Sequence, residues 1–244
     1  MKKLIPLLLL PLLLKSATII NGGFETGDLT GWTFTGEVAN SFNSRVEGGA
    51  FTEATSWASQ FNFFSPQNIE GDHSFFSGFD GPIQQISLSQ SVGIIDESTS
   101  AISFKVRAAW DLETYSQNST DVQNNEGVVL DREIRVMVID NQTNETLIDQ
   151  SLFNAVGGEF ISDSGLTMVG IELDSVVGHD VTLSFVQNIP QAYTGPALIQ
   201  IDDIQLQQTY IPEYSGYSLL FGFGVFIYTV IRYKYARKKD IRTL

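Results

Sequence analysis

Short runs of alternating apolar and polar residues recur through the middle of the chain. In residues 101–110 (AISFKVRAAW) every even-numbered position is apolar, whereas the odd-numbered positions include Lys105 and Arg107. The same period of two is present in residues 84–92, 132–140 and 181–189. This period is typical of β-strands with one buried face, and no comparable helical pattern occurs. Because segments rich in Asn, Gly, Asp and Ser separate the runs, the pattern predicts a β-sandwich or barrel.

In a further run, residues 197–206 (ALIQIDDIQL), the apolar residues shift from odd-numbered to even-numbered positions. Ile199 and Ile201 share one face, and Ile204 and Leu206 share one face, but residues 201 and 204 are an odd number of positions apart. A β-bulge at Asp202–Asp203 would return both pairs to the core and redirect a carboxylate. Two adjacent acids within a hydrophobic strand are costly to bury unless they meet a cation or hydrogen-bond donors.

The two ends of the chain differ from its middle. Residues 1–17 (MKKLIPLLLLPLLLKSA) combine lysines, a leucine-rich run and small residues, which is the layout of a secretory signal peptide. Residues 215–231 are uncharged and are followed by the basic stretch RYKYARKK, which indicates a transmembrane helix with a cytoplasmic basic end. A buried core helix is the alternative. We therefore predict a signal peptide at 1–17, a β-sandwich domain at 18–210 and a C-terminal sorting or anchoring segment at 211–244.

The predicted domain is strongly acidic. Residues 18–210 contain five Lys and Arg but 26 Asp and Glu, which gives a net charge of −21. Such a surface repels nucleic acids and anionic membranes, so DNA and RNA are excluded as partners. The chain has no cysteine. An exported domain without disulfides must be stabilised by its core or by a bound metal.

Motifs that would carry catalysis are missing from the sequence. The only histidines, His73 and His179, have no zinc-binding spacing, and the chain has neither a Gly-x-Ser-x-Gly elbow nor a cysteine nucleophile. The many acids offer pairs for glycoside cleavage, but no single pair stands out. We predict a protein that is not an enzyme, and a secreted glycan-active enzyme remains an alternative.

Three short stretches, in this order, carry a resemblance to a known family. They are NGGFETGDLTGW at 21–32, GDHS at 71–74 and IDDI at 201–204. Together they resemble carbohydrate-binding-module-like jelly rolls with the galactose-binding-domain fold, over roughly residues 19–207. The resemblance implies an all-β jelly-roll sandwich in which the first and last strands lie close together.

The same resemblance implies a structural Ca²⁺ ion near the junction of those strands. Its side-chain ligands would be Glu25, Asp202 and Asp203, and backbone carbonyls around residues 68–72 would complete the shell, since Ca²⁺ takes six to eight oxygens. The alternative is that Glu25 is a solvated turn acid and that the two aspartates make hydrogen bonds at a strand end.

A sugar site needs an exposed aromatic ring surrounded by polar groups. Trp57, Tyr115 and Tyr193 lie in irregular or polar stretches, and Arg107 lies on the polar face of its strand, so these four residues are the candidates for carbohydrate binding. The alternative for each aromatic is an incidental packing role. Trp32 is interpreted as a core residue.

The C-terminal segment resembles a PEP-CTERM sorting signal, which implies an exosortase-type enzyme as partner. Pro212 and Glu213 match its motif, but Tyr214 stands where the family has a second proline. A plain single-pass membrane anchor is the alternative. The expected function is that of an exported protein of the envelope surface or extracellular matrix of a Gram-negative-type bacterium, binding polysaccharide or another glycan. A structural or adhesive surface protein without a sugar site is the other reading.

Overall fold

The computed structural model describes residues 17–36, 64, 67, 69–79, 81–114, 116 and 119–208, and of residues 45–48, 78 and 79 the backbone alone. All of them belong to the compact unit Met1–Gln208. Within this described part, no helix is long and apolar enough to cross a membrane. The predicted signal peptide up to residue 16, the segment 211–244 with Pro212 and Glu213, and the candidates Trp57 and Tyr115 lie outside the described residues.

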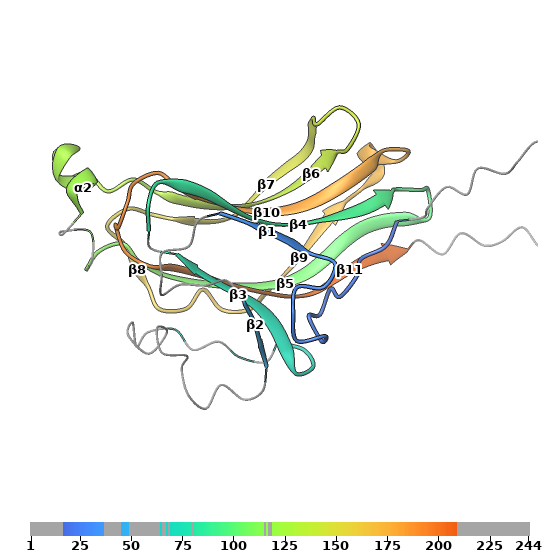
Figure 1. Cartoon of the computed structure of the whole chain (residues 1–244), viewed down its shortest axis with the longest axis horizontal. Coiled ribbons are helices and arrows are strands. Elements are labelled where there is room, and N and C mark those ends of the chain that lie inside the picture. Colours follow the sequence, from blue (N-terminus) through green and yellow to red (C-terminus); the bar gives the residue numbers. More distant parts are fainter. Residues whose placement is uncertain are drawn as a thin grey trace, which may run out of the picture. The chain divides into compact units, whose positions relative to one another are not determined.

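Two antiparallel β-sheets face each other across the core, which confirms the predicted all-β sandwich (Figure 1). The first sheet has the order β1-β4-β10-β6-β7, with bounds Thr33–Thr35, Gln84–Ile94, Asp180–Ile189, Arg132–Asp140 and Thr146–Ala155. The second has the order β2-β3-β11-β5-β8, with bounds Arg45–Gly48, His73–Phe79, Ala197–Gln208, Thr99–Asp111 and Phe160–Ile161, and β9 (Thr167–Glu172) also pairs with β5.

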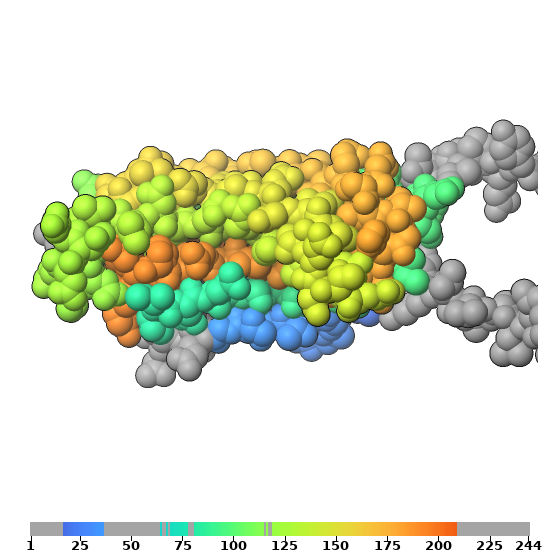
Figure 2. All heavy atoms as spheres, turned by 90° about the horizontal axis from the view of Figure 1, so that it is seen from above, coloured from blue at the N-terminus to red at the C-terminus, as the bar shows by residue number. Residues whose placement is uncertain are grey.

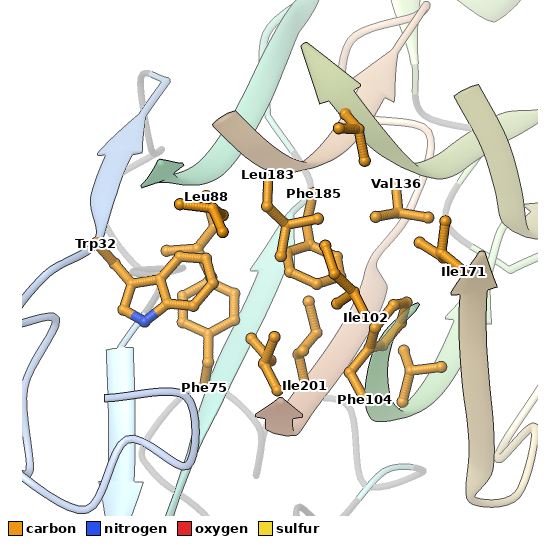
Figure 3. Packing of buried hydrophobic residues seen from close by; sticks show 14 of the residues in the cluster. Trp32, Phe75, Leu88, Ile102, Phe104, Val136, Ile171, Leu183, Phe185 and Ile201 are labelled. Carbon is orange, nitrogen blue, oxygen red and sulfur yellow. The ribbon is translucent and has the colours of Figure 1, made fainter. Parts of the chain in front are cut away.

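The inward faces of the strands are those that the alternation predicts. Ile102, Phe104 and Val106 of β5 are at most 1% exposed, and Leu183 and Phe185 of β10 oppose them from the other sheet (Figure 3). The rings of Phe104 and Phe185 meet edge to face with centroids 5.0 Å apart. Each such side chain contributes roughly 1.5–3 kcal/mol by leaving water, so this layer stabilises the sandwich.

The predicted bulge in β11 is confirmed. The register between β11 and β5 shifts between Asp202 and Gln205, and Asp203 adopts a φ of +53°. As a result Ile201 and Ile204 are both buried, with 0% and 2% of their surface exposed. Because of the bulge, the side chains of Asp202 and Asp203 point in different directions and meet different partners.

The polar segment between β5 and β6 contains a short helix, α2 (Thr120–Asn124). The Ser119 hydroxyl caps it by accepting the Val122 N–H at 3.5 Å. Five residues are too few to show a helical period, which is why the sequence pattern missed this turn. A 3₁₀ turn, η2 (Asp174–Val176), lies between β9 and β10.

Loops gather at the two ends of the sandwich. We call the end formed by residues 81–83, 112–114, 116, 119–131, 156–159 and 190–196 the loop end; Figure 2 shows green atoms around α2 beside orange atoms at this end. The first and last described residues of the domain lie at the end of the sandwich opposite to the loop end. There the Ala17 N–H donates to Ile94 O at 3.1 Å, and Gln208 pairs with Thr99.

Candidate functional site

The first and last segments of the domain meet at Gly22 and Ile204. The Ile204 N–H donates to the carbonyl of Gly22 at 3.0 Å. A Cβ atom on Gly22 would lie 2.0 Å from the carbonyl oxygen of Ile204, so no side chain fits at this position. The predicted proximity of the two segments is confirmed, and this contact explains the first of the two glycines.

Glu25 joins the opening segment to the start of β3. Its carboxylate accepts the backbone N–H of Asp72 at 3.0 Å and that of His73 at 3.1 Å. A Cβ atom on Gly71 would lie 2.2 Å from Glu25 Oε1, so glycine permits this close approach. Desolvation opposes ionisation of Glu25, but the two N–H groups outweigh it and lower the pKa of this carboxyl.

Asp202 is 0% exposed and its two oxygens face different donors. Oδ1 accepts the Asp203 N–H at 2.7 Å, and Oδ2 accepts the Glu70 N–H at 3.0 Å. Burial outweighs these bonds and raises the pKa of Asp202 to about 7, and the negative charges of Asp203 and Glu25 raise it further. In the part of the chain that the structure describes, no Lys, Arg or His side chain pairs with this buried acid.

Asp203 points elsewhere because of the bulge. Its carboxylate lies 2.9 Å from Lys105 Nζ, and the same ammonium group pairs with Glu70. Burial opposes ionisation of Asp203, but the hydrogen bonds from Lys105 and Gln205, together with the Lys105 charge, outweigh it and lower the pKa of Asp203. The Glu70 and Asp203 carboxylates in turn raise the pKa of Lys105.

The predicted calcium ligands therefore fall into two groups. Glu25 and Asp202 both approach Gly23, where a Cβ atom would lie 3.7 Å from Glu25 Cγ and 3.8 Å from Asp202 Oδ1. Both residues thus border the same glycine, whereas Asp203 pairs with the Lys105 ammonium group. Across the described residues, no three His, Asp or Glu side chains gather as a metal-binding group. An ion at Glu25 and Asp202 would need backbone carbonyls as further ligands.

Arg107 lies where a ligand has little access. Only 6% of its surface is exposed, and its guanidinium donates to both carboxylate oxygens of Asp163 at 2.8 and 2.6 Å. The guanidinium carbon also lies 4.5 Å from the ring centre of Phe64, and that ring stacks on Phe76. Arg107 therefore holds Phe64 and Asp163 against the outer face of the second sheet.

Tyr193 is the aromatic candidate that the structure places on the surface, with 56% of its area exposed. Its backbone has a φ of +53°, and its N–H donates to Gly81 O at 3.0 Å. A bulky residue rarely adopts this left-handed conformation, and such strain persists where the surrounding structure holds it.

The loops beneath Tyr193 are tied to one another by side-chain hydrogen bonds. The Ser119 hydroxyl donates to Ala192 O at 2.5 Å, and Asp121 accepts the Ala192 N–H at 2.8 Å. The amide of Gln191 connects to the segment before β6, and the fully buried Arg132 donates to Thr194 Oγ1 at 2.6 Å. The loop that carries Tyr193 is thus fixed on both sides.

Other exposed apolar side chains belong to the same end of the sandwich or border it. They are Ile83, Val128, Leu130, Val156 and Phe160. The alternation could not reveal them, because it predicts which strand residues are buried and says nothing of loops. The only sequence signal was the apolar stretch Val128–Leu130 within a polar segment.

Comparison with known proteins finds similar solved structures but no family to which the chain can be assigned. No family model matches the chain, and no curated protein matches it. Among solved structures, TmCBM61 in complex with β-1,4-galactotriose matches at 14% identity and a TM-score of 0.44, covering 79% of this chain and 99% of that one. The Stig cyclase Fisc from Fischerella sp. TAU matches at 13% and 0.46, covering 79% and 96%. The adhesin domain of Lys-gingipain from Porphyromonas gingivalis W83 matches at 10% and 0.42, covering 77% and 96%. With TM-scores below 0.5, these likenesses carry no conclusion about function.

Proposed function

We propose that the chain is an exported, non-catalytic module that binds a glycan at its loop end, with Tyr193 as the platform for a sugar ring. The observation that carries the proposal is the exposed Tyr193 ring on a backbone held at a φ of +53°. A tyrosine ring offers an apolar face and a polar tip, which suits the C–H face and the hydroxyls of a sugar. Because the loop is already fixed, binding costs little ordering entropy.

We further propose that the sandwich is a jelly roll of the galactose-binding-domain type, stabilised by Ca²⁺ at Glu25 and Asp202. The support is the contact between the motifs: the Glu25 carboxylate binds the backbone of residues 72 and 73, and Ile204 binds Gly22. Segments that lie far apart in the sequence thus meet as the family resemblance requires.

Export and sorting remain part of the proposal. Residues 1–17 would direct export, and residues 211–244 would pass the chain to an exosortase-type enzyme or hold it in the membrane. The described domain ends at Gln208, at the end of the sandwich opposite to the loop end.

The test compares wild type with Tyr193→Asn and Tyr193→Phe by affinity electrophoresis through a panel of polysaccharides. Asn tolerates a positive φ but has no ring, whereas Phe keeps the ring. Losing about 60 Å² of buried apolar surface costs about 1.5 kcal/mol, or roughly tenfold in affinity. We expect Tyr193→Asn to lose retardation and Tyr193→Phe to keep most of it. Equal binding by all three proteins would rule out the platform.

An adhesive role without a sugar site is the second candidate, and the exposed apolar residues Ile83, Val128 and Leu130 favour it. In that case no polysaccharide would retard the chain. Adsorption to deglycosylated envelope fractions would instead fall in Ile83→Asp and remain in Tyr193→Asn.

A further inference from the structure

We infer that the loop end selects an uncharged glycan and excludes polysaccharides that carry carboxylate or sulfate groups. The inference rests on the proposed function and adds the class of ligand. It follows from the charges that surround Tyr193 and from the partners that the basic residues already have.

The loop end is acidic and has no basic residue. Its described residues, 81–83, 112–114, 116, 119–131, 156–159 and 190–196, include five acids and no Lys or Arg; the acids are Glu113, Asp121, Glu126, Asp131 and Glu159. The nearest basic residue in the sequence, Arg132, is 0% exposed and donates to Thr194 beneath the loop. An anionic sugar at Tyr193 would therefore meet negative charge without a compensating cation.

The other basic side chains that the structure describes also form ion pairs with carboxylates. Lys105 pairs with Glu70 and Asp203, as shown above. Arg107 pairs with Asp163. The remaining one, Arg135, pairs with Glu133 and with Asp149. Each of these three cationic groups thus already pairs with a carboxylate.

Two neutral donors next to Tyr193 in the structure are occupied as well. The Ser119 hydroxyl donates to Ala192 O, and the Gln191 amide donates to Val128 O. The exposed carboxylates Glu113 and Glu126 are acceptors only. Sugar hydroxyls can donate to carboxylates in charge-assisted hydrogen bonds, whereas a uronate or sulfate group cannot. The carboxylates of the loop end therefore suit a ligand rich in hydroxyl donors.

The first experiment uses one polysaccharide in two charge states. The neutral polysaccharide that retards the intact chain most strongly in a panel of pullulan, mannan, galactan and β-glucan is oxidised at C6, which converts CH₂OH to a carboxylate. We expect at least a tenfold weaker retardation by the oxidised form at 10 mM salt. Part of the binding should return at 500 mM salt, where charges are screened.

Two matched double variants locate the effect. Glu113→Lys with Glu126→Lys reverses two charges at the loop end, and Glu97→Lys with Glu145→Lys makes the same change in net charge at the opposite end, where both residues are exposed. The first pair should recover binding to the oxidised form at least fivefold, and the second should not. Circular dichroism confirms that both variants fold.

The outcomes separate the two proposals. Binding of the oxidised form as tightly as the neutral one would overturn the selection for uncharged glycans and leave glycan binding intact. Equal recovery in both double variants would also overturn it, because net charge rather than the loop end would then be responsible. If neither form of any polysaccharide binds, the proposed function fails and this inference fails with it.

Discussion

Asp202 should make the domain less stable as the pH rises from 4 to 7, and Asp202→Asn should remove this dependence. Burial raises the pKa of Asp202 to about 7, against an ordinary value of 3.8. Between these values the unfolded chain releases the proton that the folded chain retains, so the free energy of unfolding falls with pH. A difference of about three pKa units corresponds to at most about 4 kcal/mol, fully felt above pH 7.

The assay is urea unfolding of wild type and Asp202→Asn at several pH values between 4.5 and 8, in the presence of a chelator. The variant should be slightly less stable at pH 4.5, because an asparagine oxygen can serve only one of the two N–H donors, at a cost of about 1 kcal/mol. It should be more stable than wild type at pH 8. Acids whose pKa is lowered, such as Glu25 and Asp163, lose their contribution only at lower pH.

Parallel pH profiles of the two proteins would refute the reasoning, because the buried carboxylate would then carry no net penalty. Calcium adds a second readout. An ion bound by Glu25 and Asp202 would favour the ionised form and flatten the wild-type profile. Asp203→Asn should keep that response, since Asp203 is paired with Lys105. A response that depends on Asp203 and not on Asp202 would contradict our division of the predicted ligands.

Three further changes test the packing. Gly22→Ala places a Cβ 2.0 Å from Ile204 O and should cost at least 1–3 kcal/mol in chemical unfolding, whereas Gly170→Ala, with open space around it, should be nearly neutral. Gln200→Leu should cost about 1–3 kcal/mol, because the fully buried amide of Gln200 binds the backbone of residue 67 and a serine hydroxyl. Phe64→Ala should cost about 3–5 kcal/mol and expose the outer face of the second sheet to proteolysis. A neutral result for Gly22→Ala would mean that the junction yields without strain.

The sequence predicted the strands and the bulge because both follow from a local rule. A period of two determines which residues face the core, and the odd spacing between Ile201 and Ile204 permits only an extra residue between them. The proximity of the opening and closing segments came from the family resemblance, and the Gly22–Ile204 hydrogen bond gives it a physical basis.

The sequence could not predict what covers the second sheet. Alternation placed Arg107 on the outward face of β5, and it does lie there. Nothing in the pattern showed that Phe64 stacks on its guanidinium or that Asp163 pairs with it. These contacts join residues separated by 43 and 56 positions, and such long-range packing is invisible to any local period. Tyr193 was identified from its place in an irregular stretch of the sequence, but its strained backbone was not.

The distinctive side chains of the opening stretch, residues 21–32, make contacts within the fold. They are therefore not available to bind a glycan. Phe24 is fully buried, and Trp32 packs against it while its indole N–H donates to Asn21 O at 3.1 Å. Glu25 clamps the start of β3, so every distinctive side chain of this stretch has an internal partner.

Tyr193 stands in contrast, since its ring is exposed while its backbone is held. Residues whose side chains complete the fold cannot be replaced without loss of stability, whereas an exposed side chain on a fixed loop can vary with the ligand. We therefore expect the two regions to separate in experiment. Changes in residues 21–32 should lower the free energy of unfolding at unchanged intrinsic affinity of the folded fraction. Changes at Tyr193 should alter affinity and leave stability within about 0.5 kcal/mol. A loss of both properties at either site would mean that the loop end and the junction form one coupled unit.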